Sequence, residues 1–442
     1  MTRKCFPSRK MRGFLIGWGL LWALCLPLIL AYLAWRARRD RLYGQHIGER
    51  FGWARPQIAP GAIWVHAVSL GELRSAVPLV QALLARGDRV LISHFTPAGR
   101  RESLRVFATE IGAGQVQVVW VPLEFGFAYR RFLHRFQPCC GLVMEIEIWP
   151  RMIAAAHKAG VPLFMCNAQY PLKSFTRDHT RTPLRAELMQ GFAGAMVKSP
   201  LQAQRFAAVG VNPIAITGEL RFDQPIPTAL LSAAQPPRAD LQRHNRHVIT
   251  IASAVEGEDD LYIQTIQTTR HHFAAQSLPA PLFVYVPRAP ERFDAVARSL
   301  QAAGLTVARR SAAFRPDLST NTDLNTIDVL LGDSLGEMYF YLALADQVVV
   351  GGGYTPKGAH NIIEPLALQK PVIVGPHIWT IEFPATEAIA AGVCAVVAPE
   401  MLAAALGPKT SAVSPTAIAT FFDTQTGAVH KTLTALDAWV KP

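Results

Sequence analysis

Residues 62–95 read AIWVHAVSLGELRSAVPLVQALLARGDRVLISHF. The apolar run 62–68 predicts a buried strand, the pattern of 71–87 predicts a helix that ends at Gly87, and 89–95 predicts a second strand. A strand, a helix and a strand in this order form a βαβ unit, in which the two strands are parallel. This stretch therefore predicts an α/β fold built on a parallel sheet.

The same alternation continues on both sides of a Pro-rich, polar stretch at 226–246. Before it, we expect strands at 116–122, 140–147, 162–168, 194–199 and 212–218. After it, we expect strands at 247–254, 282–288, 305–309, 327–333, 347–353, 371–376 and 395–399. The pattern predicts two Rossmann-like domains that face each other across a cleft. Their predicted boundaries are 46–225 and 247–415, with a linker at 226–246 and a C-terminal helix at 416–442.

Composition and charge exclude several classes of protein. Half of the 442 residues are apolar and 17% are charged, which excludes a disordered chain. Six cysteines without a C-x-x-C pair favour neither a disulfide scaffold nor a zinc or redox site. The net charge is +12, of which residues 1–55 carry +9. Because a nucleic-acid binder spreads its basic residues over a folded face, we expect no nucleic-acid partner.

The basic N-terminus encloses an uncharged stretch, GFLIGWGLLWALCLPLILAYLAW, between Arg12 and Arg36. About 20 apolar helical residues cross a bilayer, so residues 1–45 predict a single-pass membrane anchor with basic flanks. The competing interpretation is a cleaved signal peptide. Its apolar core is ordinarily about 7–15 residues and ends at an A-x-A site, which this stretch lacks. Both flanks are basic, so charge alone does not predict the orientation.

In parallel sheets, ligands bind at the carboxyl ends of the strands, and two loops there carry carboxylates. Glu72 follows the first strand and opens a helix, where it is either a carboxylate that complements the helix dipole or a general base. Glu145 and Glu147 end a later strand on one side of it. They are either a solvated strand end or part of a site.

Two later loops could hold an anion. Arg288 follows a strand and could pair with a phosphate or a carboxylate, although it could equally be an ordinary surface arginine. The glycines of 351–353 precede a predicted helix, so their N–H groups could face an anion. Asn361 and Glu364 are three residues apart and are expected to share a face of that helix. The loop matches neither a P-loop nor a dinucleotide fingerprint.

With these loops placed, the chain resembles the bacterial 3-deoxy-D-manno-octulosonic acid (Kdo) transferases of lipopolysaccharide synthesis. The resemblance covers the N-terminal anchor and a series of motifs between residues 62 and 384. In order they are WVHAVSLGE, EIEIWP, NAQYPLKSF, GELRFD, ASAVEGEDD, VPRAPERF, GDSLGEM, GGGYTPKGAHNIIEP and GPH. Each motif alone is weak, but nine in one order are specific.

The resemblance implies a GT-B fold and an inverting transfer of Kdo from CMP-Kdo to the lipid A precursor (lipid IVA), without a metal or a further cofactor. It implies that Glu72 is the general base, that Glu145 stabilises the transition state, and that Arg221 replaces the family's lysine. The positions that match the CMP site are Pro287, Arg288, Leu335, Gly336, Glu337, Asn361, Ile362, Ile363 and Glu364. Since CMP-sugars are cytosolic, the domains are expected on the cytoplasmic face of the inner membrane.

The chain also departs from the family pattern. Ala289 replaces the usual His, and Ala254-Val255 replace a Thr-His pair. The segment NAQYPLKSF lacks a usual Ser. Two other interpretations therefore stay open: a GT-B transferase that uses a different nucleotide sugar, such as a UDP-sugar, or an inactive membrane-tethered module that binds CMP or lipid.

Overall fold

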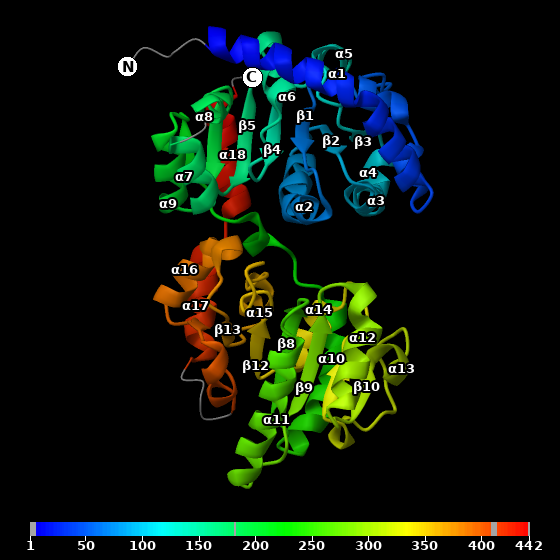
Figure 1. The fold of residues 1–442 in the computed structure, drawn as a ribbon, viewed down its shortest axis with the longest axis vertical. Helices are drawn as coiled ribbons and strands as arrows, with labels where there is room; N and C mark the ends of the chain where they lie inside the picture. Colours follow the sequence, from blue (N-terminus) through cyan, green and yellow to red (C-terminus); the bar gives the residue numbers. More distant parts are fainter. Residues whose placement is uncertain (1–5, 181–182, 408–412, 441–442) are drawn as a thin grey trace. The chain divides into compact units, whose positions relative to one another are not determined.

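The computed structural model describes residues 6–180, 183–407 and 413–440, and it contains two compact units (Figure 1). Unit 1 holds the residues up to Gln224 together with those from Gly427 onward. Unit 2 spans Pro225–Thr426. The chain therefore passes from unit 1 to unit 2 and back again.

Unit 1 is built on a seven-stranded parallel sheet in the order β3-β2-β1-β4-β5-β6-β7. β1 to β6 are buried along their whole length, which explains why they are continuous apolar runs rather than alternating ones. The strands are β1 (Ile63–His66), β2 (Val90–His94), β3 (Val116–Trp120), β4 (Cys140–Met144), β5 (Leu163–Ala168), β6 (Gly194–Val197) and β7 (Ile214–Ile216).

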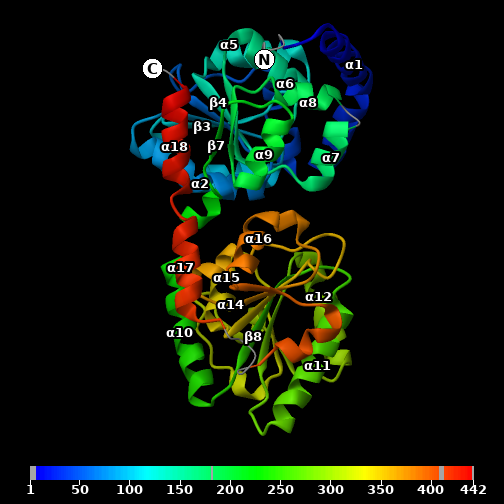
Figure 2. The ribbon, with the colours of Figure 1, turned by 90° about the vertical axis from the view of Figure 1, so that its left-hand side faces the viewer.

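Helices surround this sheet, and each forms where apolar residues recur at helical spacing (Figures 1 and 2). The helices are α1 (Arg9–Ala37), α2 (Leu70–Ala85), α3 (Pro97–Val106), α4 (Ala108–Gly112), α5 (Gly126–Phe136), α6 (Pro150–Ala159), α7 (Leu172–Thr180), α8 (Pro183–Met189), α9 (Pro200–Ala208) and α18 (Ala428–Trp439). Three 3₁₀ turns also belong here: Arg41–Gly44, Ile47–Phe51 and Leu220–Asp223.

Unit 2 has a second seven-stranded parallel sheet, in the order β10-β11-β9-β8-β12-β13-β14. Its strands are β8 (Val248–Ala254), β9 (Leu282–Pro287), β10 (Val307–Arg309), β11 (Val329–Leu331), β12 (Gln347–Val350), β13 (Val372–Val374) and β14 (Cys394–Val396). Its helices are α10 (Thr228–Arg243), α11 (Asp259–Ala275), α12 (Phe293–Ala302), α13 (Arg310–Ala313), α14 (Met338–Leu344), α15 (Ile363–Ala367), α16 (Glu382–Ala390) and α17 (Pro415–Gln425). Short 3₁₀ turns lie at Pro290–Arg292, Leu324–Thr326, Trp379–Ile381, Pro399–Met401 and Ala403–Ala405.

The predicted fold class, two Rossmann-like α/β units, is confirmed, and every predicted strand position holds a strand. Parallel pairing follows from the helix that separates each strand from the next. The reason the whole pattern could be predicted is that buried parallel strands are apolar on both faces.

Two predicted segments are organised differently. The stretch 226–246 was expected to be a linker because it is Pro-rich, yet Thr228–Arg243 form α10, which packs against α14. The stabilisation from burying Ala234 and Leu241 outweighs the cost of the helix hydrogen bonds that Pro236 and Pro237 cannot donate.

The segment 416–442 was predicted to be one C-terminal helix, but it contains two helices that belong to different units. α17 belongs to unit 2, and α18 packs on the sheet of unit 1, where Leu436 is buried (Figure 2). The break lies at Thr426-Gly427, where Gly427 has a φ of 83° that favours glycine. The backbone N–H groups of Gly427 and Val429 both donate to Asp223, at 2.7 and 2.6 Å.

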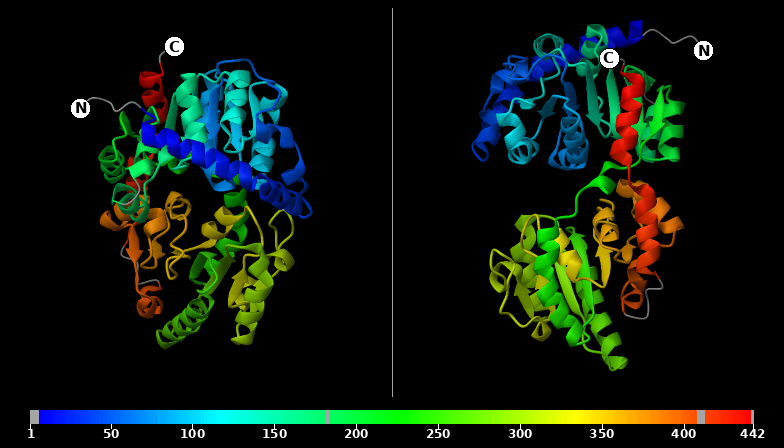
Figure 3. Two further views of the ribbon diagram at one scale, coloured as in Figure 1. Left: turned by 45° about the horizontal axis from the view of Figure 1, so that its top comes forward. Right: turned by 180° about the vertical axis from the view of Figure 1, so that it is seen from behind.

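α1 is the one helix in the described residues that is long and apolar enough to cross a membrane. One face of it contacts unit 1: Met11 and Leu15 are buried, and the indole N–H of Trp18 donates to Glu124 Oε2 at 2.9 Å. The opposite face is apolar and exposed. It consists of Ile16, Leu20, Leu24 and Leu28, whose side chains are 61–78% exposed. Figure 3 shows this helix running along unit 1.

Candidate active site

Each sheet has one point at which the strand order reverses, and crevices at such points are where ligands bind in α/β proteins. In unit 1 the reversal falls between β1 and β4. Glu72 follows β1 and Glu145 follows β4, so two predicted catalytic residues lie beside this point. In unit 2 it falls between β8 and β12, which precede the ASAVEGEDD and GGGYTPKGAHNIIEP motifs.

Glu72 is held at the N-terminus of α2 by its own loop. Its Oε2 accepts the backbone N–H of Val68 at 2.7 Å, and its Oε1 accepts the hydroxyl of Ser69 at 2.9 Å. This arrangement resembles a capping box, and it keeps the carboxylate in the first turn of α2, where it complements the helix dipole. Burial, followed by the negative charge of Glu147, raises the pKa of Glu72 to about 7. A carboxylate with that pKa is suited to accept a proton near neutral pH.

Glu145 belongs to a buried network of charges. Its two carboxylate oxygens each lie 3.0 Å from the ammonium group of Lys198, which also lies 2.8 Å from Glu219 Oε2. The side-chain amide of Asn167 donates to Glu145 at 3.1 Å and to Glu219 at 2.8 Å. Burial alone would lower the pKa of Lys198, but the two carboxylates outweigh it and raise that pKa. The ammonium group is therefore charged.

Arg221, the third predicted catalytic residue, contacts α2 and lies close enough to Lys198 and Glu219 for its charge to lower their pKa values. Its Nε donates to Ser75 Oγ at 2.7 Å, on the first turns of α2 that also carry Glu72. The close cation of Glu145 is thus Lys198 rather than Arg221. The structure brings Glu72, Glu145 and Arg221 to one edge of the sheet of unit 1.

The glycine loop of unit 2 differs from its prediction. Its backbone N–H groups were expected to face an anion, but those of Gly352 and Tyr354 donate to the buried carboxylate of Glu258, at 2.8 and 3.1 Å. Val255 N–H also donates to this carboxylate, at 3.0 Å. Glu258 therefore shapes the loop from inside the protein, and those N–H groups are already paired.

The segment after this loop also differs in detail. α15 begins at Ile363, so Asn361 precedes it and the two predicted residues Asn361 and Glu364 do not share a face of one helix. Instead, Asn361 Oδ1 accepts the backbone N–H of Ile363 at 3.0 Å. The side chains of Ile362 and Ile363 are buried, so only their backbone could contact a ligand.

The remaining predicted donor residues lie on neighbouring loops of unit 2. Pro287 ends β9, and the N–H of the exposed Arg288 donates to Ala254 O at 2.8 Å. Burial and the nearby charge of Arg288 lower the pKa of His360 to about 4, which places a neutral imidazole close to this guanidinium.

The loop after β11 carries the other three predicted positions. Leu335 is exposed, Gly336 has a φ of 82°, and Glu337 accepts a hydrogen bond from Arg310 Nη2 at 2.6 Å. Because β8, β9, β11 and β12 are parallel neighbours, the predicted donor residues gather at one edge of the sheet of unit 2.

Sequence analysis did not single out Lys198, Asn167, Glu219, Glu258 or Arg310. A usable signal existed for Lys198, which comes directly after the apolar strand Gly194–Val197, as the predicted residues do after theirs. Glu219 and Glu258 lie inside motifs that were recognised. Their partners are distant in sequence, so their roles needed the structure.

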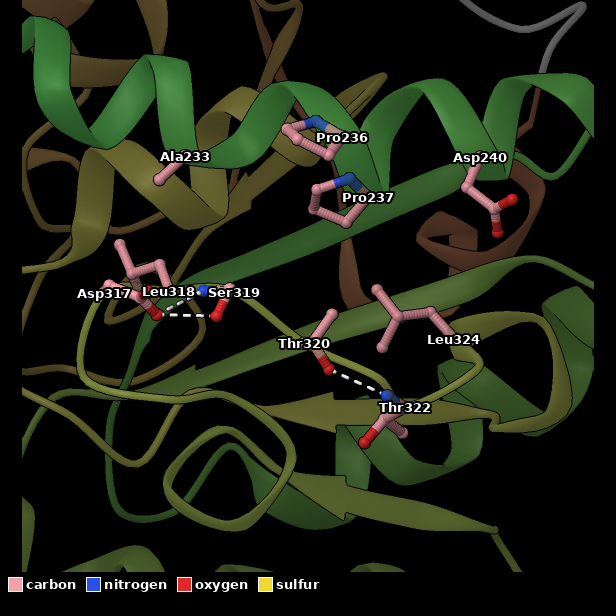
Figure 4. A pocket seen from close by; sticks show the side chains of 10 residues that line it. All are labelled: Ala233, Pro236, Pro237, Asp240, Asp317, Leu318, Ser319, Thr320, Thr322 and Leu324. Carbon is pink, nitrogen blue, oxygen red and sulfur yellow. Dashed lines mark hydrogen bonds between the residues drawn. The ribbon is translucent and has the colours of Figure 1, made fainter.

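A cavity of about 350 Å³ lies elsewhere in unit 2, between α10 and the loop before β11 (Figure 4). None of the predicted donor residues lines it. In its wall, Ser319 donates to Asp317 and the N–H of Thr322 donates to Thr320. Its lining residues are Ala233, Pro236, Pro237, Asp240, Asp317, Leu318, Ser319, Thr320, Thr322 and Leu324.

Two seven-stranded parallel-sheet units with charged residues at both reversal points have the GT-B architecture, and solved structures share this fold. A glycosyltransferase from Rickettsia africae ESF-5 matches with a TM-score of 0.54 at 10% identity, over 86% of this chain and 99% of that one. UDP-GlcNAc 2-epimerase from Neisseria meningitidis matches with a TM-score of 0.51 at 13% identity, over 84% and 100%. These likenesses establish the fold alone.

Sequence comparison identifies the family. The model of the 3-deoxy-D-manno-octulosonic-acid transferase (kdotransferase) family matches residues 45–224. The 3-deoxy-D-manno-octulosonic acid transferase of Bordetella pertussis is 41% identical over 94% of this chain and 96% of its own length. That of Haemophilus influenzae is 31% identical over 82% and 81%. The chain belongs to the 3-deoxy-D-manno-octulosonic acid transferase family, as the motifs predicted.

Proposed function

We propose that this protein transfers Kdo from CMP-Kdo to a hydroxyl group of the lipid A precursor, with inversion at the anomeric carbon. Membership of the family supports the transferred sugar. The observation that carries the mechanism is the position of Glu72, which lies beside the reversal point of unit 1 with a pKa of about 7. A carboxyl group with a pKa raised toward neutral can receive a proton there.

In the proposed step, Glu72 removes the proton from the acceptor hydroxyl while the acceptor oxygen forms a bond to the anomeric carbon of Kdo. The bond between that carbon and the phosphate oxygen of CMP breaks, and CMP leaves with the electron pair. The proton stays on Glu72 until solvent takes it. A positioned general base contributes about 10²–10⁴-fold to such a reaction. Glu145, which forms an ion pair with Lys198, is proposed to stabilise positive charge that develops on the sugar.

The donor is proposed to bind unit 2. Arg288 would pair with its phosphate or carboxylate, and the 361–364 segment would contact the nucleotide. A transferase that uses a UDP-sugar is the competing proposal. Competition of CMP and UDP against labelled CMP-Kdo separates the two, because a CMP-sugar enzyme is inhibited by CMP at far lower concentration than by UDP.

The central experiment measures transfer of labelled Kdo from CMP-Kdo, generated in situ, to a tetraacylated lipid A precursor. We expect a product that carries Kdo, and NMR of its glycosidic bond to show inversion. A folded protein that binds CMP but forms no product with this acceptor would contradict the proposal and favour the inactive binding module.

We also propose that the transfer needs no metal and no cofactor besides the donor. In the described ranges, no three His, Cys, Asp or Glu side chains are grouped as metal ligands would be. Arg288 would supply part of the positive charge that a metal supplies to leaving phosphates elsewhere. Activity should therefore be the same with and without excess EDTA. A loss that added Mg²⁺ or Zn²⁺ restores would contradict this part of the proposal.

The proposed location is the inner membrane, with both units on the cytoplasmic side. The apolar face of α1 supports attachment, because Ile16, Leu20, Leu24 and Leu28 are exposed on one side of the helix. Basic residues at both ends, among them Arg9 and Arg39, suit anionic lipid head groups. A lipid acceptor makes such attachment useful, since it confines the enzyme to the surface that holds the substrate.

Two positions of α1 relative to the bilayer are compatible with a membrane anchor. Its length fits a single-pass helix, whereas its contacts from Ser8 to Glu187 and from Trp18 to Glu124 fit a helix that lies in the interface while docked on unit 1. A protease-sensitive tag placed before residue 1 distinguishes them. In vesicles with the cytoplasmic side outward, the tag is protected if the helix spans the bilayer and cleaved if it lies in the interface.

A further inference from the structure

Lys198 is a buried cation at the centre of the charged network of unit 1. Its side chain is 5% exposed, follows β6 directly, and lies within 3.0 Å of Glu145 and 2.8 Å of Glu219. Taking an ammonium group out of water costs several kcal/mol unless its partners compensate for it. Here two carboxylates do so, and one of them is a predicted catalytic residue.

The backbone around Glu145 is held in an uncommon conformation. Glu145 has a φ of 58° and Asn167, at the same edge on β5, has a φ of 53°. Residues other than glycine seldom adopt these values unless their surroundings impose them. The side chain of Asn167 bridges Glu145 and Glu219, and its Oδ1 accepts the N–H of Leu220 at 3.0 Å. The network therefore fixes the direction of the Glu145 carboxylate.

We propose that Lys198 is a positioning residue for the transfer reaction, which keeps the Glu145 carboxylate ionised and in a single orientation. This inference rests on the proposed function. The resemblance placed a cation at position 221, and Arg221 donates to Ser75 and acts on the charges of Lys198 and Glu219. The charge that Glu145 needs is thus provided from a different strand, by a residue that no motif includes.

The consequences of removing Lys198 follow from the charges around Glu145. Without the ammonium group, Glu145 and Glu219 would share one amide with no cation between them. Neighbouring carboxylates in that situation take up a proton more readily. The ionised form of Glu145 would then appear only at higher pH, so activity lost at neutral pH should return as the pH is raised. The charged or titratable groups that face this network are Lys198, Glu219, Arg221, Glu72, Glu147 and Cys166.

The first test uses the pH dependence of transfer in Lys198→Met, with Lys158→Met as the matched control because Lys158 is exposed on α6. We expect Lys198→Met to lose about 10–100-fold in kcat/KM at pH 7. This loss corresponds to an acidic limb of the pH profile that is displaced upward by about one or two pH units. Most of the activity should return by about pH 9. Glu145→Gln should lose activity at every pH, and the double variant should be no worse than Glu145→Gln alone. Equal losses at all pH values, or losses that multiply in the double variant, would overturn the proposal.

A second variant covers the case in which Lys198→Met does not fold. Glu219→Gln removes the competing carboxylate and leaves Lys198 paired with Glu145 alone. The Glu145 carboxyl group should then titrate at lower pH, opposite to the shift in Lys198→Met, while the acidic limb that Glu72 sets in kcat/KM stays in place. A Glu145 titration that is unchanged, or that moves to higher pH, contradicts the proposal.

A measurement without substrate separates this inference from the proposed function. In protein with ¹³C-labelled glutamate side chains, the Glu145 carboxyl signal is identified by its loss in Glu145→Gln. We expect that signal to titrate at higher pH in Lys198→Met, or in the opposite direction in Glu219→Gln, whether or not Kdo is transferred. A wild type without transfer activity but with these shifts would refute the function alone, while unchanged titration in an active enzyme would refute the role of Lys198.

Discussion

The two units share one architecture but use the carboxyl ends of their strands differently. In unit 1, the carboxylates of Glu72 and Glu145 lie at this edge and stay partly exposed; Glu72 is bound by its own loop, and Glu145 by Lys198 from another loop. In unit 2, the corresponding carboxylate, Glu258, is fully buried and accepts backbone N–H groups of its own loops. What unit 2 exposes there is a cation, Arg288.

This difference shows how one fold supports two tasks. A carboxylate that keeps contact with solvent and has a raised pKa can exchange protons, whereas a carboxylate enclosed by N–H groups can only determine the shape of a loop. The proposed function therefore gives proton transfer to unit 1 and anion binding to unit 2. A substitution in one unit should therefore change the task of that unit and leave the task of the other unaffected.

The largest effect is expected from Glu72→Gln. Glutamine keeps an acceptor for the Val68 N–H and so preserves the helix cap, but it cannot take a proton. Transfer should fall by about 10²–10⁴-fold. Calorimetric binding of CMP should be unchanged, because unit 2 is untouched. Full activity in this variant would remove Glu72 from the mechanism, and a loss of CMP binding would contradict the division of tasks.

Glu258→Ala should destabilise unit 2. It leaves the buried N–H groups of Val255, Gly352 and Tyr354 without their acceptor, which we expect to cost about 3 kcal/mol. For a unit of this size, that lowers Tm by about 6–12 °C in a thermal melt. Glu256→Ala in the same loop is the control, since its side chain is 82% exposed and should melt like wild type. Equal melting of both variants would refute the structural role of Glu258.

Arg288→Ala should weaken CMP binding by about 10–100-fold, the range of a hydrogen bond to a charged group. Isothermal titration with CMP measures the change. Arg298→Ala, on the exposed face of α12, removes the same charge from unit 2 and should bind as wild type does. If both variants bind CMP normally, the anion is held by other groups.

The pH profile gives the smallest change, about tenfold per pH unit. Burial raises the pKa of Glu72 to about 7, and a general base acts in its ionised form. Therefore kcat/KM should rise with pH up to about 7 and then level off, while CMP binding to unit 2 should show no limb at that pH. A profile that is flat between pH 5 and 8 would mean that Glu72 is not the base.

Much of the fold and part of the site could be predicted from sequence, for a physical reason. Buried parallel strands are continuous apolar runs, and ligands bind in the loops at their carboxyl ends. This is why Glu72, Glu145 and Arg288 could be predicted to lie at strand ends. α10 was missed because its two prolines indicate a linker, whereas its burial against α14 depends on contacts distant in sequence.

The rest of the site could not be predicted because it depends on which loops meet. The sequence indicated that the glycine loop leads into a helix, but not that Glu258, 94 residues earlier, occupies its N–H groups. Likewise, the resemblance indicated a cation at Arg221, and only the structure shows that a second cation, Lys198, pairs with Glu145. The contacts that a side chain makes with a distant loop, unlike the positions of strands, leave no periodic pattern in the sequence.

The return of the chain to unit 1 determines the order in which the protein can be completed during synthesis. Domains generally fold as the ribosome releases them, from the N-terminus onward. α1 emerges before either sheet, but unit 1 lacks α18 until residues 428–439 are made, so the apolar surface that buries Ala428 and Leu436 stays uncovered while unit 2 is synthesised. Unit 2, although second in the sequence, is continuous and can be finished earlier. A ribosome that stops before residue 427 therefore leaves the proton-transfer half incomplete and the anion-binding half whole.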